Sequence, residues 1–285
     1  MKKIIVICCI VALFFVPILL RSKQSEQEPS ESEPCEPVVF VDGTSIPLES
    51  YVLGVIAAEM PASYELEALK AQAIASRTYA LYNKDTELTS TVKHQVFHTQ
   101  SQRAEKWQDD YTTYEEKLSR AVNETAGQVI TYNDDLISAM FHAASNGQTE
   151  SALNFSGHDI PYLQSVSSPE VDEVSQPLAV SWSKQDIEQM KLVRNSTGRV
   201  ESVTVAATTL TGRELREQLS LRSTDFQFTI KDGKVVVTTF GYGHGVGMSQ
   251  QGANEYAKKG WLAPEILTHY YTNTKIESYS CKKID

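Results

Sequence analysis

Positive charge is scarce in this sequence of 285 residues. It has 26 lysines and arginines against 36 aspartates and glutamates, which gives a formal net charge of −10. A chain with so little positive charge does not neutralise a polyanion, so this composition argues against a partner bound through its phosphates. We therefore predict no nucleic-acid partner.

Cysteine is also scarce, with only four in the chain. Cys8 and Cys9 fall in an apolar run near the N-terminus, where cysteine behaves as a small hydrophobic residue. Cys35 and Cys281 flank the predicted globular part. On an extracytoplasmic face these two could form a disulfide or remain free thiols, and the sequence leaves that choice open.

Motifs that would identify other enzyme classes are missing. The glycine-rich stretch at residues 241–250 does not match G-x-G-x-x-G and has no Gly-Lys-Ser/Thr pair, which argues against nucleotide binding. There is no His-Glu-x-x-His, and the spacing of His94 and His98 is weak support for a metal site. Ser145 lacks the Gly-x-Ser-x-Gly elbow of serine hydrolases. We therefore predict no metal and no cofactor.

The N-terminal end of the chain predicts a membrane anchor. Residues 4–20 form an uncharged apolar run, and no small-x-small cleavage site follows it, which favours a retained anchor over residues 1–21. Residues 22–37 are rich in Ser, Glu and Pro and predict an extended acidic linker. We therefore expect a single-pass protein of the cell membrane, with residues 38–285 forming an extracytoplasmic domain.

Hydrophobic periodicity in the globular part predicts a mixed α+β fold in a single domain. Helical spacing and strand-like runs occur without a regular alternation of the two, and no internal repeat is visible. We expect helices at 48–59, 65–82, 114–124, 186–191 and 212–221. We expect strands at 38–41, 128–132, 136–142, 200–208 and 226–240, the last split into a hairpin at Asp232 and Gly233.

Glu59 is the strongest candidate for a catalytic group. It ends an apolar, alanine-rich helix that Pro61 stops by disfavouring helical geometry at Met60. Apolar surroundings penalise the ionised form of a carboxyl, and a carboxyl that keeps its proton near neutral pH can serve as a general acid. The alternative is a solvated glutamate on the outer face of the helix.

The glycine-rich stretch at residues 241–250 is a second candidate site. It follows a predicted strand and precedes a polar helix-like segment, a setting in which backbone N–H groups can hold a ligand. His244 lies between two glycines that would let a substrate approach closely, which predicts a polar contact with a sugar. The alternative is a tight structural turn with a hydrogen-bonded histidine.

Several segments together resemble one family. They are YVLGVIAAEMPASYELEALKAQAIASRTYA at 51–80, AGQVITYND at 126–134, FHAASNGQTE at 141–150, PYLQSVSSP at 161–169 and GYGHGVGMSQQGANEYAKKG at 241–260. These motifs resemble the stage II sporulation protein D family of endospore-forming bacteria. The likeness extends over most of residues 38–279.

The resemblance implies a lytic transglycosylase of peptidoglycan. Such an enzyme cleaves the bond between N-acetylmuramic acid (MurNAc) and N-acetylglucosamine (GlcNAc) in strands stripped of stem peptides, and it leaves a 1,6-anhydro-MurNAc end. The matching catalytic acid is Glu59. Because the C6 hydroxyl of the muramic acid itself attacks the anomeric carbon, no water is activated and no second carboxylate is required.

The resemblance also assigns roles to other residues. Arg77 matches an arginine that would hold a substrate carboxylate or acetamide oxygen, with a structural ion pair as the alternative. His142 and Ser145 match a His-x-x-Ser/Cys turn and are expected to bind substrate, and serine in place of cysteine here disfavours bound zinc. Four residues of the glycine-rich stretch are expected to line the glycan groove: Tyr242, His244, Ser249 and Gln250.

The family's biology implies action during engulfment of the forespore, from the mother-cell side of the septum. The expected partners are peptidoglycan glycan strands, the cell membrane, a peptidoglycan amidase-endopeptidase and a membrane protein of the engulfment complex. Two other functions remain open. One is a non-catalytic glycan-binding scaffold that activates a partner amidase, and the other is a metal-dependent peptidase acting on stem peptides.

Overall fold

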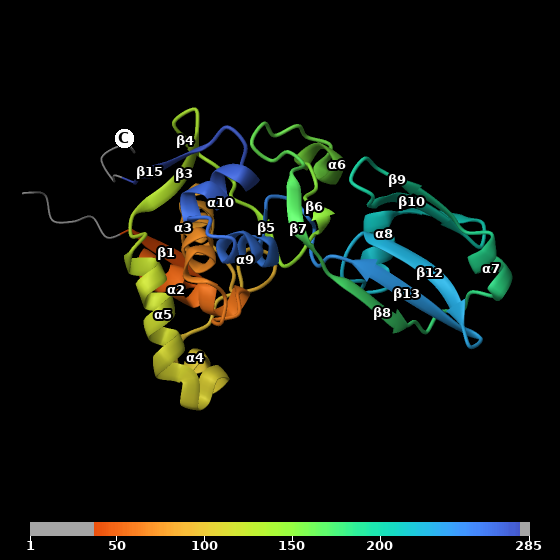
Figure 1. Cartoon of the computed structure of the whole chain (residues 1–285), viewed down its shortest axis with the longest axis horizontal. Coiled ribbons are helices and arrows are strands. Elements are labelled where there is room, and N and C mark those ends of the chain that lie inside the picture. Colours follow the sequence, from red (N-terminus) through yellow and green to blue (C-terminus); the bar gives the residue numbers. More distant parts are fainter. Residues whose placement is uncertain (1–36, 280–285) are drawn as a thin grey trace, which may run out of the picture. The chain divides into compact units, whose positions relative to one another are not determined.

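A central helix organises the larger of two hydrophobic cores. The computed structural model describes residues 37–279, and in it α3 (Leu66–Tyr82) has twelve buried residues, five of them alanines. Small side chains allow neighbouring elements to approach the helix closely. The elements that pack against α3 (Figure 1) are α2 (Leu48–Glu59), α5 (Tyr111–Asn123), β3 (Gln128–Tyr132), α9 (Gln250–Lys258) and α10 (Ala263–Tyr270).

Short elements complete this part of the fold. β1 and β2 form an antiparallel hairpin, β15 and β4 flank β3, and β5 pairs in parallel with β14. A capping box between Thr99 and Gln102 starts α4. The bounds of these elements are β1 (Val38–Val41), β2 (Thr44–Pro47), α4 (Gln100–Trp107), η1 (Gln108–Asp110), β4 (Asp135–Leu136), β5 (Phe141–His142), β14 (Met248–Ser249) and β15 (Lys275–Ser278).

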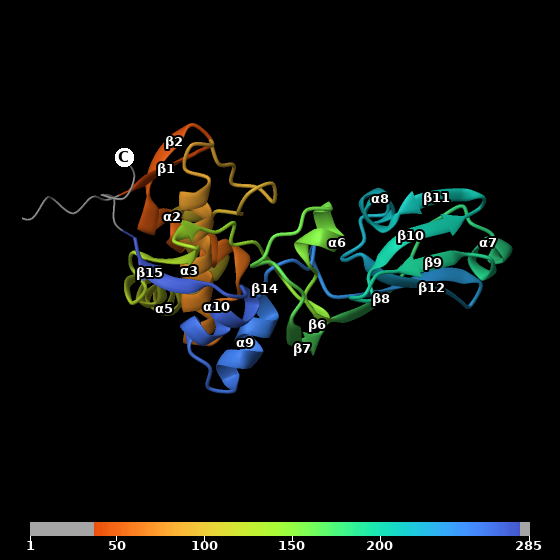
Figure 2. The same ribbon diagram turned by 90° about the horizontal axis from the view of Figure 1, so that it is seen from above.

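A second core forms within the segment that runs from β8 to β13. Two three-stranded antiparallel sheets have the strand orders β11-β10-β9 and β12-β13-β8 (Figure 1 and Figure 2). They bury apolar residues such as Val203, Phe226 and Val237. The bounds are β8 (Glu173–Pro177), α7 (Lys184–Glu188), β9 (Lys191–Arg194), β10 (Val200–Val205), β11 (Thr208–Thr211), α8 (Gly212–Gln218), β12 (Asp225–Lys231) and β13 (Lys234–Phe240).

Three further elements directly precede the second core in the sequence. β6 (Asn146–Gln148) and β7 (Ser167–Val171) pair with each other antiparallel, and α6 (Ala152–Ser156) follows β6. The chain then enters the second core at β8 and leaves it through the glycine-rich stretch that ends at β14. The second core is therefore formed by one continuous segment of the chain, inserted between β7 and β14.

The α+β class is confirmed, and so are several predicted bounds. α2 covers residues 48–59 as predicted, and the hairpin at 226–240 turns at Asp232 and Gly233, whose φ values of 52° and 72° suit a two-residue type I′ turn. The predicted strand at 136–142 is wrong. Only its two ends are strands, because β4 pairs with β3 whereas β5 pairs with β14 from the far end of the chain.

Residues 37–279 contain no helix that is long and apolar enough to cross a bilayer. The predicted anchor at residues 1–21 lies outside the described residues, as do all but the last residue of the predicted linker at 22–37. Cys35 and Cys281 also lie outside them, so the choice between a disulfide and free thiols stays open.

A glycine on α2 allows a loop to cross the helix next to Glu59. A Cβ at Gly54 would lie 2.2 Å from the Phe97 ring and 2.7 Å from the His98 carbonyl oxygen. The His98 amide donates a 3.1 Å hydrogen bond to the Gly54 carbonyl, and the Phe97 ring stacks on Tyr51 at 5.6 Å between centroids. Gly54 thus lets the segment at residues 95–98 lie directly on α2.

Replacing Gly54 by Ala should lower the free energy of unfolding by about 1–3 kcal/mol, because the added methyl overlaps Phe97 and the backbone of His98. This sign is opposite to the gain of roughly 0.5–1 kcal/mol that Gly→Ala gives in an open helix. Urea unfolding followed by circular dichroism measures it. Ser50→Ala, at an exposed position of the same helix, is the control and should change stability by less than about 0.5 kcal/mol. Stabilisation by Gly54→Ala would contradict the packing described.

Candidate functional site

Two segments far apart in sequence form the frame of the site. In the parallel pair of β5 and β14, Phe141 lies opposite Met248 and His142 lies opposite Ser249. Gly247, with φ of 72°, makes this pairing possible, since a Cβ there would lie 2.0 Å from the Met140 carbonyl oxygen. The pairing therefore places residues 141–145 beside the glycine-rich stretch.

A buried glutamate joins these two segments. Glu170, on β7 and 5% exposed, accepts a 2.9 Å hydrogen bond from the Ser145 amide and another from the Ser249 hydroxyl. Its second carboxylate oxygen accepts from Ser168 at 2.5 Å. Ser145 and Ser249 are themselves fully buried. These two serines therefore hold the site together, and the structure corrects the prediction that they touch substrate, because neither has an exposed atom to offer.

His142 is buried and uncharged. It is 4% exposed, and its Nδ1 lies 3.3 Å from the Val246 carbonyl oxygen. Its Nε2 has no hydrogen-bond partner among the described residues. Burial holds the pKa of His142 well below its usual value, with the nearby His244 as the next cause. At neutral pH the ring is therefore neutral, and it faces His244 at 5.9 Å between centroids.

His244 is partly exposed at the wall of a cavity. Its Nδ1 accepts a 3.0 Å hydrogen bond from the Val246 amide, and its ring lies 5.4 Å from that of Phe155. Burial, followed by the charge of Arg216, lowers the pKa of His244 to about 4. The neutral ring is thus hydrogen-bonded within a tight turn, which was the alternative to a sugar contact. The same ring also lines the cavity.

Tyr242 remains open to solvent, with 47% of its surface exposed. Its backbone pairs with Ala144 through hydrogen bonds of 2.7 and 3.1 Å. The guanidinium of Arg222 lies 4.3 Å from the centre of its ring and forms an ion pair with Asp172. Among the predicted groove residues, Tyr242 therefore has an aromatic surface that is free for a sugar.

Glu59 is partly buried at the C-terminal end of α2, close to the glycine-rich stretch. Its Oε1 accepts a 2.8 Å hydrogen bond from the Val96 amide, and the Gln250 side chain also hydrogen-bonds to it. Burial raises the pKa of Glu59, and these two hydrogen bonds oppose the rise only in part. Gln250 is 4% exposed and reaches Gln72 on α3 at 3.3 Å. The structure thus brings two of the predicted site residues, Glu59 and Gln250, into contact.

Arg77 is fully buried in the first core, and no described contact joins it to Glu59 or to the glycine-rich stretch. Its Nε and terminal nitrogen bind the two carboxylate oxygens of Glu49 at 2.8 and 2.5 Å, and its other nitrogen donates to the Gln128 carbonyl at 3.1 Å. With its donors engaged and no exposed surface, Arg77 forms the structural ion pair that was the alternative to substrate binding. The prediction that it holds substrate is corrected accordingly.

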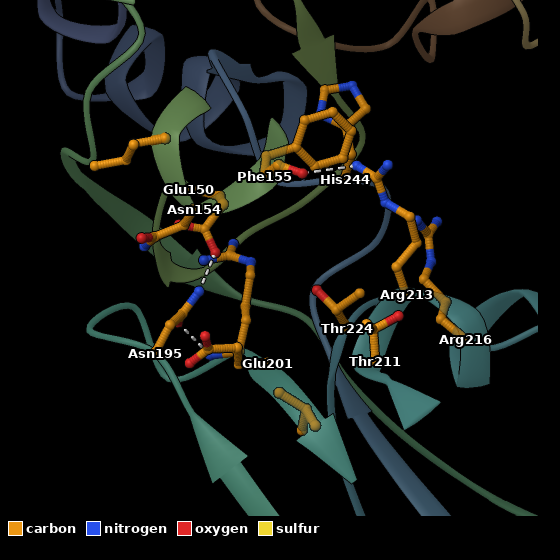
Figure 3. Close-up of a pocket in the computed structure, with 13 residues that line it drawn as sticks. Glu150, Asn154, Phe155, Asn195, Glu201, Thr211, Arg213, Arg216, Thr224 and His244 are labelled. Carbon is orange, nitrogen blue, oxygen red and sulfur yellow. Dashed lines mark hydrogen bonds between the residues drawn. The ribbon is translucent and has the colours of Figure 1, made fainter. Parts of the chain in front are cut away.

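The sequence motifs do not indicate a cavity of about 500 Å³ that lies beside His244. Three arginines line it, Arg199, Arg213 and Arg216, together with Phe155. Figure 3 shows Arg213, Arg216 and Phe155 in this lining. No motif marks these arginines, and only the fold brings them together. No group of three or more His, Cys, Asp or Glu side chains that could hold a metal occurs in the described part of the chain.

Comparison with known proteins gives matches over most of the chain. The family model SpoIID, stage II sporulation protein, matches residues 42–132, which include Glu59. Stage II sporulation protein D of Bacillus amyloliquefaciens is 37% identical over 283 residues, covering 90% of this chain and 82% of the relative. The protein of the same name from Bacillus subtilis is 37% identical over 261 residues, covering 81% and 75%. The amidase enhancer of Bacillus subtilis is 26% identical over 294 residues, which cover 79% of this chain and 40% of that protein.

Replacing Arg77 by Met should lower the free energy of unfolding by about 1–3 kcal/mol, because it leaves the partly buried Glu49 carboxylate without its guanidinium and the Gln128 carbonyl without a donor. Urea unfolding measures the loss. Arg120→Met is the matched control, since Arg120 also pairs with a glutamate but its side chain is 64% exposed, and it should change stability by less than about 1 kcal/mol. Full stability of Arg77→Met with a selective loss of glycan binding would instead restore the substrate-binding role.

Proposed function

The chain belongs to the stage II sporulation protein D family, and on that basis we propose that it is a lytic transglycosylase of peptidoglycan with Glu59 as its catalytic acid. Its substrate is the MurNAc–GlcNAc linkage of glycan strands stripped of stem peptides. Its products end in 1,6-anhydro-MurNAc. The observation that carries this proposal is a partly buried carboxyl with a raised pKa beside Gln250 of the glycine-rich stretch.

In the proposed reaction the protonated Glu59 carboxyl donates its proton to the glycosidic oxygen as the bond from that oxygen to the anomeric carbon breaks. GlcNAc leaves with a free 4-hydroxyl. The C6 hydroxyl of MurNAc forms the new bond to the anomeric carbon, and its proton passes to the Glu59 carboxylate. The acid is thereby regenerated, no water is consumed, and one carboxyl performs both proton transfers.

The surroundings of Glu59 suit this double role. No lysine, arginine or histidine within residues 37–279 forms an ion pair with it, so no cation holds it permanently ionised. Its hydrogen bonds come from the neutral donors of Val96 and Gln250. Such donors fix the orientation of the carboxyl and also stabilise the carboxylate that forms during the reaction.

The setting we propose for this reaction is the outer face of the cell membrane, reached through an anchor at residues 1–21. There the chain would act on the septal wall during engulfment, beside an amidase-endopeptidase and a membrane protein. The 26% identity with the amidase enhancer supports a second candidate, a scaffold that binds glycan and activates an amidase without cleaving the strand. The importance of the Glu59 carboxyl distinguishes the two candidate functions, because only the transglycosylase requires a proton from it.

Glu59→Gln should reduce strand cleavage at least about 100-fold, since the amide has no proton of suitable acidity to donate. Full-length protein in detergent is incubated with peptide-free glycan strands, and mass spectrometry measures the 1,6-anhydro-MurNAc ends. Glu105→Gln, at an exposed position of α4, is the control and should cleave as the wild type does. Hydrolysed reducing ends, or equal cleavage by Glu59→Gln, would reject the mechanism. Intact strands with the wild type would favour the scaffold.

The rate of cleavage should fall as the pH rises through the pKa of Glu59, because only the protonated form donates. Burial raises this pKa above its usual value of 4.5, so the midpoint of the alkaline limb of kcat/KM should lie above pH 4.5. Gln250→Met removes a hydrogen bond that lowers the pKa and should move that midpoint to higher pH. A midpoint at or below 4.5, or a shift to lower pH in Gln250→Met, would contradict this role for Glu59.

A further inference from the structure

The cavity beside His244 is lined by side chains from four places in the fold. Phe155 comes from α6, Arg213 and Arg216 from α8, and Arg199 precedes β10. Figure 3 shows Arg213 reaching toward the Phe155 ring, with His244 next to that ring. The cavity is separate from Glu59, but both adjoin the glycine-rich stretch, through His244 and Gln250 respectively.

Arg199 is the first indication that the cavity receives a ligand. It is 4% exposed, its only side-chain hydrogen bond joins one terminal nitrogen to the Gln148 carbonyl oxygen at 3.1 Å, and its other terminal nitrogen has no partner in the described part of the chain. A buried guanidinium with an unmade hydrogen bond is costly unless an acceptor reaches it. The lack of a side chain at Gly245 leaves room for this group, since a Cβ there would lie 2.6 Å from it.

The carboxylate of Glu150, which also lines the cavity, is already occupied. It accepts four hydrogen bonds of 2.7 to 2.9 Å from neutral donors, namely the Ser151 amide, the side-chain amides of Asn154 and Asn195, and the Thr197 hydroxyl. None of the described ion pairs includes Arg199. Glu150 is therefore engaged elsewhere, and the buried terminal nitrogen of Arg199 has no acceptor among residues 37–279.

Arg213 and Arg216 add positive charge on one face of α8, three residues apart. Arg213 lies 4.0 Å from the centre of the Phe155 ring and donates to the Phe155 carbonyl at 3.0 Å. Arg216 donates only to backbone carbonyls, those of Leu221 and Arg222. Neither forms an ion pair with a described carboxylate. Three arginines thus line one cavity in a chain whose net charge is −10.

We propose that this cavity binds a carboxylate of the glycan, namely the lactyl carboxylate of a MurNAc residue that carries no stem peptide. The inference rests on the proposed function. Arginine forks match a carboxylate through paired hydrogen bonds, and the faces of Phe155 and His244 offer apolar surface to the lactyl methyl group. A stem peptide converts this carboxylate into a neutral amide. Arg199, Arg213 and Arg216 would therefore distinguish peptide-free from peptide-bearing MurNAc.

The test measures equilibrium binding of full-length Glu59→Gln protein, so that no strand is cleaved. The probes are peptide-free glycan strands, the same strands with their carboxylates converted to methylamides, and strands that retain their stem peptides. Peptide-free strands should bind about tenfold more tightly than methylamide strands, as expected for losing a charged hydrogen-bonded pair. Adding Arg213→Gln or Arg216→Gln should abolish most of that difference. Arg120→Gln, which removes an exposed arginine of α5, should preserve it.

Each outcome has a separate meaning. Equal binding of peptide-free and methylamide strands would overturn the proposal, as would an undiminished difference in a folded Arg213→Gln protein. Tight binding of peptide-bearing strands that depends on Arg213 would assign the carboxylate to the stem peptide and reject the lactyl group. Cleavage by wild-type protein is measured in parallel. Strands that bind through Arg213 but stay intact would reject the transglycosylase while leaving the binding site in place.

Discussion

The pairing of β5 with β14 is the interaction on which the rest of the site depends. It pairs a strand that precedes the second core in the sequence with a strand that follows it. Glu170 stabilises this pairing by accepting hydrogen bonds from Ser145 and Ser249. Because Gln250 follows Ser249 directly, this pairing also fixes the side chain that contacts Glu59. An acid on α2 and a glycine-rich turn almost two hundred residues later therefore meet through one short parallel ladder.

Three glutamates show how the hydrogen-bond and ion-pair partners of a carboxyl determine its role. Glu49 faces the guanidinium of Arg77, which gives it a structural role in the first core. Glu150 is surrounded by four neutral donors and organises the loops near the cavity. Glu59 receives two neutral hydrogen bonds, and burial raises its pKa. Glu59 thus combines a raised pKa with neutral partners, and that combination suits proton transfer.

The sequence predicts well where the determining forces are local. The end of α2 follows from Pro61 and the hairpin turn from Asp232 and Gly233, since each depends on backbone geometry at one or two residues. The strand at 136–142 could not be predicted correctly, because the partner of its second half comes from residues 248–249. The three arginines of the cavity could not be predicted from periodicity either, because residues distant in the sequence come together only when the second core folds next to α6.

The glycine-rich stretch connects the proposed acid with the proposed carboxylate site. His244 lines the cavity and Gln250 contacts Glu59, so five residues separate the two contacts. Gly245 and Gly247 lie between them with positive φ, and each would clash with a neighbour if it carried a side chain. The stretch is thus packed from both sides, against Arg199 and against the Met140 backbone. A MurNAc bound in the cavity through its carboxylate would contact the glycine-rich stretch, whose position relative to Glu59 is fixed before the substrate binds. Such preorganisation allows binding energy to contribute to catalysis.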